Sequence, residues 1–348
     1  MEPKSARRQT GSLTIQDVAR FAGVSPMTVS RVINDEKNVR TSTREAVQAA
    51  IRELNYQPNP AARSLAGADL VRIGLLYSNP SAAYLSEFLV GSLDQCSRSN
   101  IQLVVEKCDE AHARAAAQRL VASGVDGIIL PPPLCDIAEV TQALRDANVP
   151  AVVVATGEPP PNTSAVRIDD FAAAKAMTQR LIGLGHRRIG FIKGHPNQTA
   201  SRLRFEGHSA AIAEAGLDAD EAPAEQGYFS YLSGFEAAER LLARRPRPTA
   251  IFASNDDMAV ACIAAAHRAG LDVPHDLSIV GFDDSAIATT VWPELTTIRQ
   301  PIADMSRQAV TLLFEEIRSR RAGQRAQHPV VLQAFELIRR QSDASPPS

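Results

Sequence analysis

The sequence of 348 residues lacks the features that define several large classes of protein. Its four cysteines form no Cys-x-x-Cys pair and have no histidines at metal-ligand spacing, so we expect reduced core thiols and no metal site. No apolar run approaches the roughly 20 residues of a membrane-spanning helix, and the N-terminus has no apolar signal segment. These absences predict a cytoplasmic protein with no membrane partner.

Common catalytic motifs are also missing. No G-x-G-x-x-G or G-x-x-x-x-G-K-[ST] loop follows a predicted strand, and neither G-x-S-x-G nor H-E-x-x-H occurs. The seven histidines are dispersed, and we expect His186 to cap a helix rather than to transfer protons. In the neighbouring pairs Asp169-Asp170 and Asp283-Asp284, one carboxylate would cap a helix while the other meets a ligand. The sequence therefore predicts no catalytic residues, no cofactor and no enzyme activity.

Charge is distributed unevenly along the chain. Residues 1–67 contain ten basic and six acidic residues, a balance of +4, whereas the whole chain carries −2. The other 281 residues therefore carry −6. A small basic module on an acidic body is expected where one part of a protein meets phosphate, although an excess this small also arises by chance.

The stretch Thr14–Asn34 has the pattern of a helix-turn-helix. Two short segments with apolar periodicity flank the turn Ala22-Gly23-Val24. Ser25 is a suitable N-cap and Pro26 a suitable first residue for the second helix, because proline lacks an N–H that would have no partner there. Ser42 and Glu45 then predict a capping box for a third helix over 42–54.

A break with two prolines, Pro58 and Pro60, follows the three helices. The segment 60–66 could form a short helix ended by Gly67, but it has few apolar residues and should not hold by itself. A plain linker is one interpretation, and a segment that folds on binding is the other.

From Val71 onward, buried strands alternate with helical periodicity. Strands are predicted over 71–78, 101–108, 126–132, 151–156 and 165–169, and a second set over 188–194, 250–255 and 278–284. Such alternation indicates parallel sheets covered by helices on both faces. Two sets of strands predict two doubly wound lobes, with a ligand in the cleft beyond the carboxyl ends of the strands.

Polar and aromatic residues at strand ends and in loops could converge on this cleft. Together they suit a polyhydroxylated small molecule, since they combine a stacking face with donors and acceptors. Each also has a purely structural interpretation, such as a surface charge for Arg204 or a core aromatic for Phe229. The predicted ligand-binding residues are Tyr84, Asp169, Arg204, Phe229, Asn255 and Asp283.

The second helix of the helix-turn-helix offers DNA-reading chemistry. Met27 and Arg31 are four residues apart and share a face, and arginine can pair bidentately with guanine in the major groove. Thr14, Thr28, Ser30 and Asn34 are hydroxyl or amide donors suited to phosphate.

The motifs TIQDVARFAGVSPMTVSRVIN, TREAVQAAIRELNYQPNPAARSLAG, DGIIL, LGHRRIGFIKG, AIFASNDDMAVA and LSIVGFDD carry a family resemblance. In this order they resemble the LacI/GalR family of bacterial repressors from Leu13 to about Arg340. The resemblance implies a small all-α headpiece and a two-lobed α/β core of the periplasmic-binding-protein type with two doubly wound parallel sheets. It also implies a homodimer on a pseudo-palindromic operator in double-stranded DNA, controlled by a small-molecule effector.

The resemblance assigns roles to individual residues. Pro26, Met27 and Arg31 match base-reading positions, with Thr28 and Ser30 near phosphate. Asn59–Ala66 matches a hinge helix that folds on DNA, in which Leu65 wedges into the minor groove beside Arg63. The residues expected at the DNA are therefore Thr14, Pro26, Met27, Thr28, Ser30, Arg31, Asn34, Asn59, Arg63, Leu65 and Ala66.

The implied domains are a disordered segment 1–12, a headpiece over 13–58, a hinge over 59–69 and a core over 70–341, followed by a disordered tail over 342–348. Within the core, the first lobe covers about 70–167 and 298–328, and the second about 168–297 and 329–341. The tail lacks leucine heptads, so we expect a dimer.

The nature of the effector is open in the sequence. A saccharide is the first expectation, and a purine or a phosphorylated metabolite the alternative. The proline runs Pro131–Pro133 and Pro159–Pro161 border the predicted cleft and give no further guidance. The rival classes are a sugar-binding receptor, which the fused helix-turn-helix disfavours, and an enzyme, which the missing motifs disfavour.

Overall fold

The computed structural model describes residues 13–33, 39–54, 56, 70–218 and 222–347. The chain forms two compact units, Met1–Leu70 and Val71–Ser348. The predicted segment 1–12 and hinge 59–69 lie outside the described residues. The same holds for five residues predicted at the DNA, namely Asn34, Asn59, Arg63, Leu65 and Ala66.

The first unit contains the predicted three helices, α1 (Ile15–Ala22), α2 (Pro26–Ile33) and α3 (Thr41–Glu53). Their inner faces meet in one small cluster that includes Val18, Val29, Val47, Ala50 and Tyr56. Gly23 ends α1 with φ of 69°, a left-handed conformation that glycine adopts at no steric cost. The turn predicted between the two helices is confirmed.

The ends of these helices confirm one predicted cap and contradict another. Ser25 Oγ accepts the N–H of Thr28 at 3.1 Å, as expected of an N-cap. The capping box predicted at Ser42 is wrong, because α3 begins one residue earlier, at Thr41, with Arg40 as an N-cap that makes no side-chain bond. Ser42 then lies inside the first turn, where its side chain cannot take the capping position.

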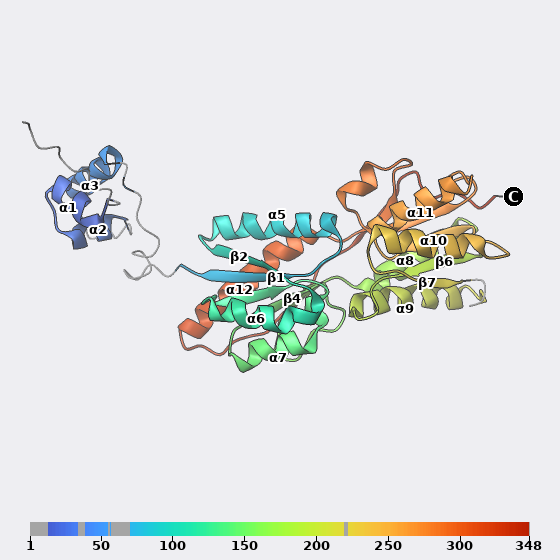
Figure 1. The fold of residues 1–348 in the computed structure, drawn as a ribbon, viewed down its shortest axis with the longest axis horizontal. Coiled ribbons are helices and arrows are strands. Elements are labelled where there is room, and N and C mark those ends of the chain that lie inside the picture. Colours follow the sequence, from blue (N-terminus) through green and yellow to red (C-terminus); the bar gives the residue numbers. More distant parts are fainter. Residues whose placement is uncertain (1–12, 34–38, 55, 57–69, 219–221, 348) are drawn as a thin grey trace, which may run out of the picture. The chain divides into compact units, whose positions relative to one another are not determined.

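The second unit contains two six-stranded sheets (Figure 1). The first runs in the order β11-β5-β4-β3-β1-β2 and is parallel throughout, and the second runs β12-β10-β9-β8-β6-β7 with only β10 and β12 antiparallel. The strands are β1 (Arg72–Tyr77), β2 (Gln102–Lys107), β3 (Gly127–Leu130), β4 (Ala151–Val154), β5 (Ser164–Arg167), β6 (Ile189–Lys193), β7 (Ala224–Gln226), β8 (Ala250–Ala253), β9 (Ser278–Asp283), β10 (Thr296–Arg299), β11 (Val330–Leu332) and β12 (Glu336–Ile338).

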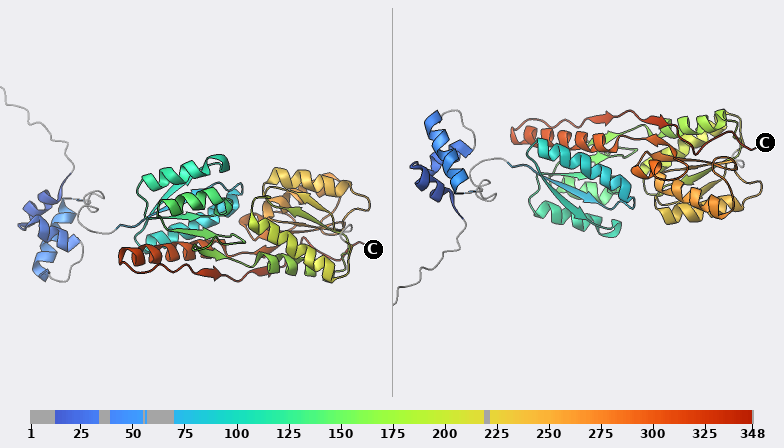
Figure 2. Two further views of the ribbon diagram at one scale, coloured as in Figure 1. Left: turned by 90° about the horizontal axis from the view of Figure 1, so that it is seen from below. Right: turned by 90° about the horizontal axis from the view of Figure 1, so that it is seen from above.

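Helices cover both faces of each sheet (Figures 1 and 2). In the first lobe α5 packs with α12, and α6 packs with α7; in the second lobe α8 packs with α9, and α10 packs with α11. Their bounds are α5 (Ala82–Arg98), α6 (Ala113–Ala122), α7 (Ala138–Asp146), α8 (Asp170–Gly183), α9 (Thr199–Glu214), α10 (Tyr231–Ala243), α11 (Asp256–Arg268) and α12 (Ile302–Arg321), with short 3₁₀ turns η1 (Glu110–His112), η2 (Leu134–Asp136) and η4 (Ala286–Thr289). The predicted pair of doubly wound lobes is confirmed. None of the described helices is both long and apolar enough to cross a membrane.

The chain passes between the lobes three times, as Figure 2 shows. The first passage follows β5, at the predicted place. The second lies after Arg299, because β10 pairs with β9 over its whole length. The third lies at residues 333–335, because β11 pairs with β5 of the first lobe. The predicted boundaries at 297 and 329 are therefore wrong by a few residues.

The predicted disordered tail is also corrected. The side chain of Asp343 is fully buried and forms an ion pair with Arg180 Nε at 2.7 Å. The backbone carbonyl of Ser342 accepts the N–H of Ile279 at 2.8 Å, so the tail extends the hydrogen bonding of the second sheet. His186 Nε2 lies 2.8 Å from the carbonyl oxygen of Ala344 and holds this segment in place. His186 thus anchors the tail with its side chain. Its backbone N–H donates to the Leu181 carbonyl at 3.2 Å and caps the end of α8, as predicted.

Ending the chain at Gln341 should lower the melting temperature markedly. It leaves Arg180, whose side chain is only 16% exposed, without its carboxylate, and breaking a buried pair costs about 3–5 kcal/mol. Calorimetry on the truncated protein measures this loss. A chain ended at Ser345 keeps Asp343 and should melt like the full-length protein. If the chain ended at Gln341 also melts like the full-length protein, the buried ion pair contributes nothing.

Candidate functional site

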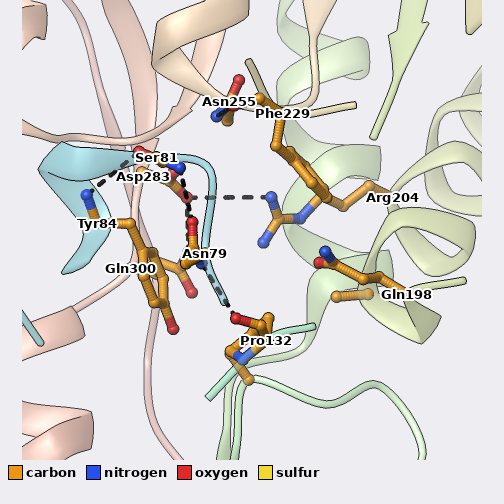
Figure 3. A pocket seen from close by; sticks show the side chains of 12 residues that line it. Asn79, Ser81, Tyr84, Pro132, Gln198, Arg204, Phe229, Asn255, Asp283 and Gln300 are labelled. Atoms are coloured by element: carbon orange, nitrogen blue, oxygen red, sulfur yellow. Dashed lines mark hydrogen bonds and ion pairs between the residues drawn. The ribbon is translucent and has the colours of Figure 1, made fainter. Parts of the chain in front are cut away.

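A pocket with about 360 Å³ of unfilled space lies between the two lobes (Figure 3). It opens where strands of both sheets end, as expected for doubly wound lobes. The lining residues are Asn79, Ser81, Tyr84, Pro132 and Ala155 from the first lobe, Gln198, Ala200, Arg204, Phe229, Asn255 and Asp283 from the second, and Gln300 from the passage between them. Five of the six residues predicted for ligand binding are among them.

Arg204 on α9 carries a buried positive charge beside the pocket and is only 4% exposed. Its Nε donates to Asp170 Oδ1 at 2.8 Å, and its Nη1 donates to the backbone carbonyl of Ser254 at 2.7 Å. The guanidinium also lies 3.6 Å above the ring of Phe282. A buried charge needs this pairing, which also holds the group in one orientation toward the pocket.

Asp283 supplies the carboxylate of the pocket and ends β9. Its Oδ1 accepts Gln300 Nε2 at 2.6 Å and lies 3.9 Å from Arg204 Nη1. Burial raises the pKa of Asp283 to about 7, and the nearby Arg204 and the Gln300 hydrogen bond limit the rise. The residue therefore changes its protonation near neutral pH.

Phe229 lies at the pocket with a left-handed backbone, φ of 60°. Asn255 holds it there, since Asn255 Nδ2 donates to the Phe229 carbonyl at 3.1 Å. The Asn255 side-chain oxygen meanwhile accepts the N–H of Met258 and caps α11. Asn255 thus positions Phe229, and its amide keeps a second N–H that can donate to a ligand in the pocket.

Asp169 is the predicted ligand-binding residue that the structure does not bring to the pocket. Its carboxylate accepts the N–H of Ala172 at 2.9 Å and caps α8. The next residue, Asp170, pairs with Arg204 instead. The prediction that one carboxylate of the pair caps a helix is confirmed. The other carboxylate does not line the pocket, as a ligand-binding group would, but pairs with Arg204, which does.

At the other pair of carboxylates the two side chains diverge. Asp283 faces the pocket, whereas Asp284 forms ion pairs with Arg299 at 2.7 Å and Arg340 at 2.6 Å. Both residues have positive φ, 113° and 57°, which turns the chain sharply at the end of β9.

Two polar atoms at the pocket have no hydrogen-bond partner among the described residues, namely the Tyr84 hydroxyl and Gln300 Oε1. Both side chains are buried, with residue exposures of 5% and 3%. Buried polar groups are normally paired, so these two atoms are suited to a polar ligand.

Pro132 belongs to the run that was predicted to border the cleft. Sequence reasoning missed the other six lining residues, namely Asn79, Ser81, Ala155, Gln198, Ala200 and Gln300. Asn79 and Ser81 could have been found, because they directly follow a predicted strand. Gln300 could not, since the short strand before it was not predicted.

In the first unit, α2 presents the predicted reading face to solvent. Pro26 and Arg31 are exposed, and Met27 is 66% exposed although apolar. Thr28 and Ser30 are half-buried, and the Thr28 hydroxyl lies 2.9 Å from Ser25 Oγ. The Thr14 hydroxyl donates to Asp17 at 2.7 Å, so part of its predicted bonding capacity is used at the start of α1.

Metal and thiol chemistry find no support in the described part of the chain. No group of three metal-binding side chains occurs among the residues that the structure describes. The four cysteines are free; three of them, Cys96, Cys135 and Cys262, are buried, and Cys108 is half-buried. Burial raises the pKa of the Cys96 and Cys108 thiols to about 11, which disfavours the reactive thiolate.

A helix-turn-helix unit joined to a two-lobed core with a polar pocket defines a class of protein, a DNA-binding regulator that responds to a small molecule. Family models match both parts: "Bacterial regulatory proteins, lacI family" over residues 14–59, and "Periplasmic binding protein-like domain" over residues 178–342. The chain is 37% identical over 311 residues to the HTH-type transcriptional repressor PurR of Haemophilus influenzae, an alignment that covers 87% of this chain and 91% of the relative. The chain belongs to the LacI family and is an effector-regulated transcription regulator, not an enzyme.

Other relatives agree. The ribose operon repressor of Escherichia coli strain K12 is 35% identical over 311 residues, covering 87% of this chain and 93% of the relative. Among solved structures, the lac repressor dimer bound to operator and the anti-inducer ONPF superposes with a TM-score of 0.83 at 29% identity, covering 96% of this chain and all of the other. The transcriptional regulator CelR in complex with cellobiose superposes with a TM-score of 0.72 at 32% identity, covering 95% and 99%.

Replacing Asp283 with asparagine should change the pH dependence of stability. An unfolded aspartate ionises near pH 4, whereas folded Asp283 ionises near 7, so ionisation of this group lowers folding stability as pH rises from about 4 to about 7. The stability of Asp283→Asn minus that of the wild type should therefore increase over this window and stay constant above it. Urea unfolding at a series of pH values measures the difference, and a constant difference across the window would contradict the raised pKa.

Proposed function

We propose that the protein is a cytoplasmic repressor of an operon for carbohydrate utilisation. In this proposal a saccharide bound in the pocket between the lobes controls how tightly the protein holds its operator. The observation that carries the effector class is the set of polar atoms around the pocket. The Asp283 carboxylate, the Arg204 guanidinium, the unpartnered Tyr84 and Gln300 oxygens and the ring of Phe229 all belong to side chains that line this pocket (Figure 3).

This set suits a neutral polyol. Ring hydroxyls donate to carboxylate and amide oxygens and accept from a guanidinium, while the apolar face of a sugar ring stacks on an aromatic. The side chains that line the pocket thus offer a hydroxyl group both an acceptor for its proton and a donor for its oxygen. One structural neighbour, the regulator CelR, is a complex with cellobiose, which supports the same class of ligand.

A phosphorylated effector fits less well. Among the described residues that line the pocket, Arg204 and Asp283 are the only charged ones, and the charge of Arg204 is already paired with Asp170 at 2.8 Å. A phosphate would therefore meet no uncompensated cation and would lie near a carboxylate, which raises its desolvation cost. A purine could stack on Phe229 and form hydrogen bonds with Tyr84 and Gln300, so a screen for the effector has to include nucleobases.

For DNA binding we propose a homodimer on a pseudo-palindromic operator. The lac repressor neighbour is a dimer on its operator, and paired headpieces match two half-sites by symmetry. We place Pro26, Met27 and Arg31 at base edges, with Thr14, Thr28, Ser30 and Asn34 at phosphates. Asn59, Arg63, Leu65 and Ala66 would belong to a hinge helix that folds on the minor groove.

Effector control then follows from the two-lobed core. The effector touches both lobes, so it changes their relative orientation and, through the chain that leaves at Val71, the spacing of the two headpieces. The pocket is compatible both with an inducer and with a corepressor.

Replacing Arg31 with alanine should weaken operator binding and reduce discrimination between operator and mutated operator. A bidentate contact between arginine and guanine contributes about 1–3 kcal/mol of discrimination. Operator fragments obtained by selection from a random library serve as probes in a binding titration. Arg52→Ala on α3, also exposed in the same unit, is the matched control and should keep specificity. Unchanged specificity in Arg31→Ala would remove this residue from base reading.

A thermal-shift screen identifies the effector. Neutral mono- and disaccharides should raise the melting temperature, because a ligand at 100 times its Kd adds about 2.7 kcal/mol. Asp283→Ala should abolish the shift while operator binding persists, and Glu139→Ala, exposed on α7, should keep both. Stabilisation by a nucleobase or a sugar phosphate, with none by any saccharide, would overturn the carbohydrate proposal and leave the DNA-binding proposal intact.

A further inference from the structure

We propose that Asp136 positions the two lobes against each other by capping a helix of the opposite lobe. Asp136 belongs to η2 of the first lobe, and the helix that it caps is α9 of the second. Together with Thr156, Gly157 and Thr199 it forms a set of hydrogen bonds that we call the interlobe latch. The latch lies beside the proposed effector pocket but shares no residue with its lining.

The latch is a closed network across the lobe boundary. Asp136 Oδ1 accepts the hydroxyls of Thr156 at 2.7 Å and of Thr199 at 2.8 Å. Asp136 Oδ2 accepts the backbone N–H of Thr199 at 3.0 Å. The Thr199 hydroxyl in turn accepts the N–H of Gly157 at 2.7 Å. Three of these bonds join one lobe to the other, and two of them end on a carboxylate, where hydrogen bonds are strongest.

Asp136 supplies the N-terminal cap that α9 does not receive from a side chain of its own N-cap residue. The residue before the helix, Gln198, makes no side-chain cap. The first N–H groups of a helix need acceptors, and a carboxylate at this end is stabilised by the helix dipole. The acceptor of the Thr199 N–H comes from the other lobe, so this bond exists only while the two lobes keep this arrangement.

The latch residues alternate with pocket residues along the chain. Ala155 lines the pocket and Thr156 joins the latch; Gln198 and Ala200 line the pocket and Thr199 between them joins the latch. A ligand that displaces either pocket segment therefore displaces the latch as well. Arg204, farther along α9, lines the pocket. The helix that Asp136 caps therefore also carries the guanidinium group of the pocket.

A second polar contact between the same segments provides a natural comparison. Arg202 of α9 pairs with Glu158 of the first lobe, but their side chains are 44% and 66% exposed. Exposed pairs contribute little to stability, whereas in the latch Thr156 and Gly157 are buried and Asp136 and Thr199 are half-buried. We therefore assign the control of lobe geometry to Asp136 and not to Glu158.

The proposal that the latch holds the two lobes together does not rest on the proposed function. Only a role of the latch in effector control would rest on it. The test consequently uses neither effector nor operator. Spin labels are placed at two exposed positions, Glu139 on α7 and Ser209 on α9, and their distance is measured by double electron–electron resonance. Cys108→Ser removes the half-buried thiol, and an excess of unlabelled protein suppresses distances between protomers.

Asp136→Asn and Thr199→Val should shift the distribution to longer and broader distances. The asparagine amide places a donor against the donors of Thr199, and valine keeps the shape and backbone N–H of Thr199 but removes its hydroxyl. Thr199→Ser restores every latch bond and should give the wild-type distribution. Glu158→Gln, which breaks only the exposed pair, should also leave it unchanged.

Hydrogen exchange separates a latch from a cap that merely stabilises α9. The Gly157 amide lies in the first lobe and is protected by the Thr199 hydroxyl of the second. Its exchange should accelerate in Asp136→Asn if the lobes separate, whereas loss of a local cap would affect only the first turn of α9. Wild-type distances and unchanged Gly157 exchange in folded Asp136→Asn and Thr199→Val would overturn the proposal, whatever effector or operator the protein is found to bind.

Discussion

The buried charge of Arg204 is the constraint on which the core depends. A guanidinium that is 4% exposed must be paired, and its partners lie at the ends of three different elements. Asp170 begins α8, Ser254 follows β8, and Asp283 ends β9. Because one side chain satisfies all three, the segments around the pocket are held in register by a single residue. The same pairing leaves the pocket without an uncompensated cation, which is why its chemistry favours a neutral ligand.

Topology explains how distant residues reach this place. Both sheets repeat the same order, in which the second strand lies outside the first and the third, fourth and fifth follow on the other side. Each sheet thus has one point where the chain reverses direction, at β1/β3 and at β6/β8, and the pocket lies beyond those points. The three passages between the lobes run beside it, so closure and ligand binding involve the same segments.

Much of the fold could be predicted from the sequence because burial on both faces makes a strand almost entirely apolar. The strand β3, with four buried residues in succession, is an example. The strands that escaped prediction are short and partly exposed: β7, β11 and β12 have three residues each. The buried strand β10 was missed because two of its four residues are threonines, whose polar character hides their burial. Its omission also concealed Gln300, since a residue is recognised as a strand-end residue only when the strand is known.

The sequence by itself determined the helix-turn-helix, the alternation of strands and helices and most of the predicted residues that reach the pocket, because caps, turns and apolar runs act over a few neighbouring residues. Tertiary structure alone decided which of two adjacent carboxylates meets Arg204, that Asp343 is buried in a tail of polar composition, and that Asp136 caps a helix of the other lobe. Each of these depends on a partner between 34 and 163 residues away along the chain, and no local pattern records the position of such a partner.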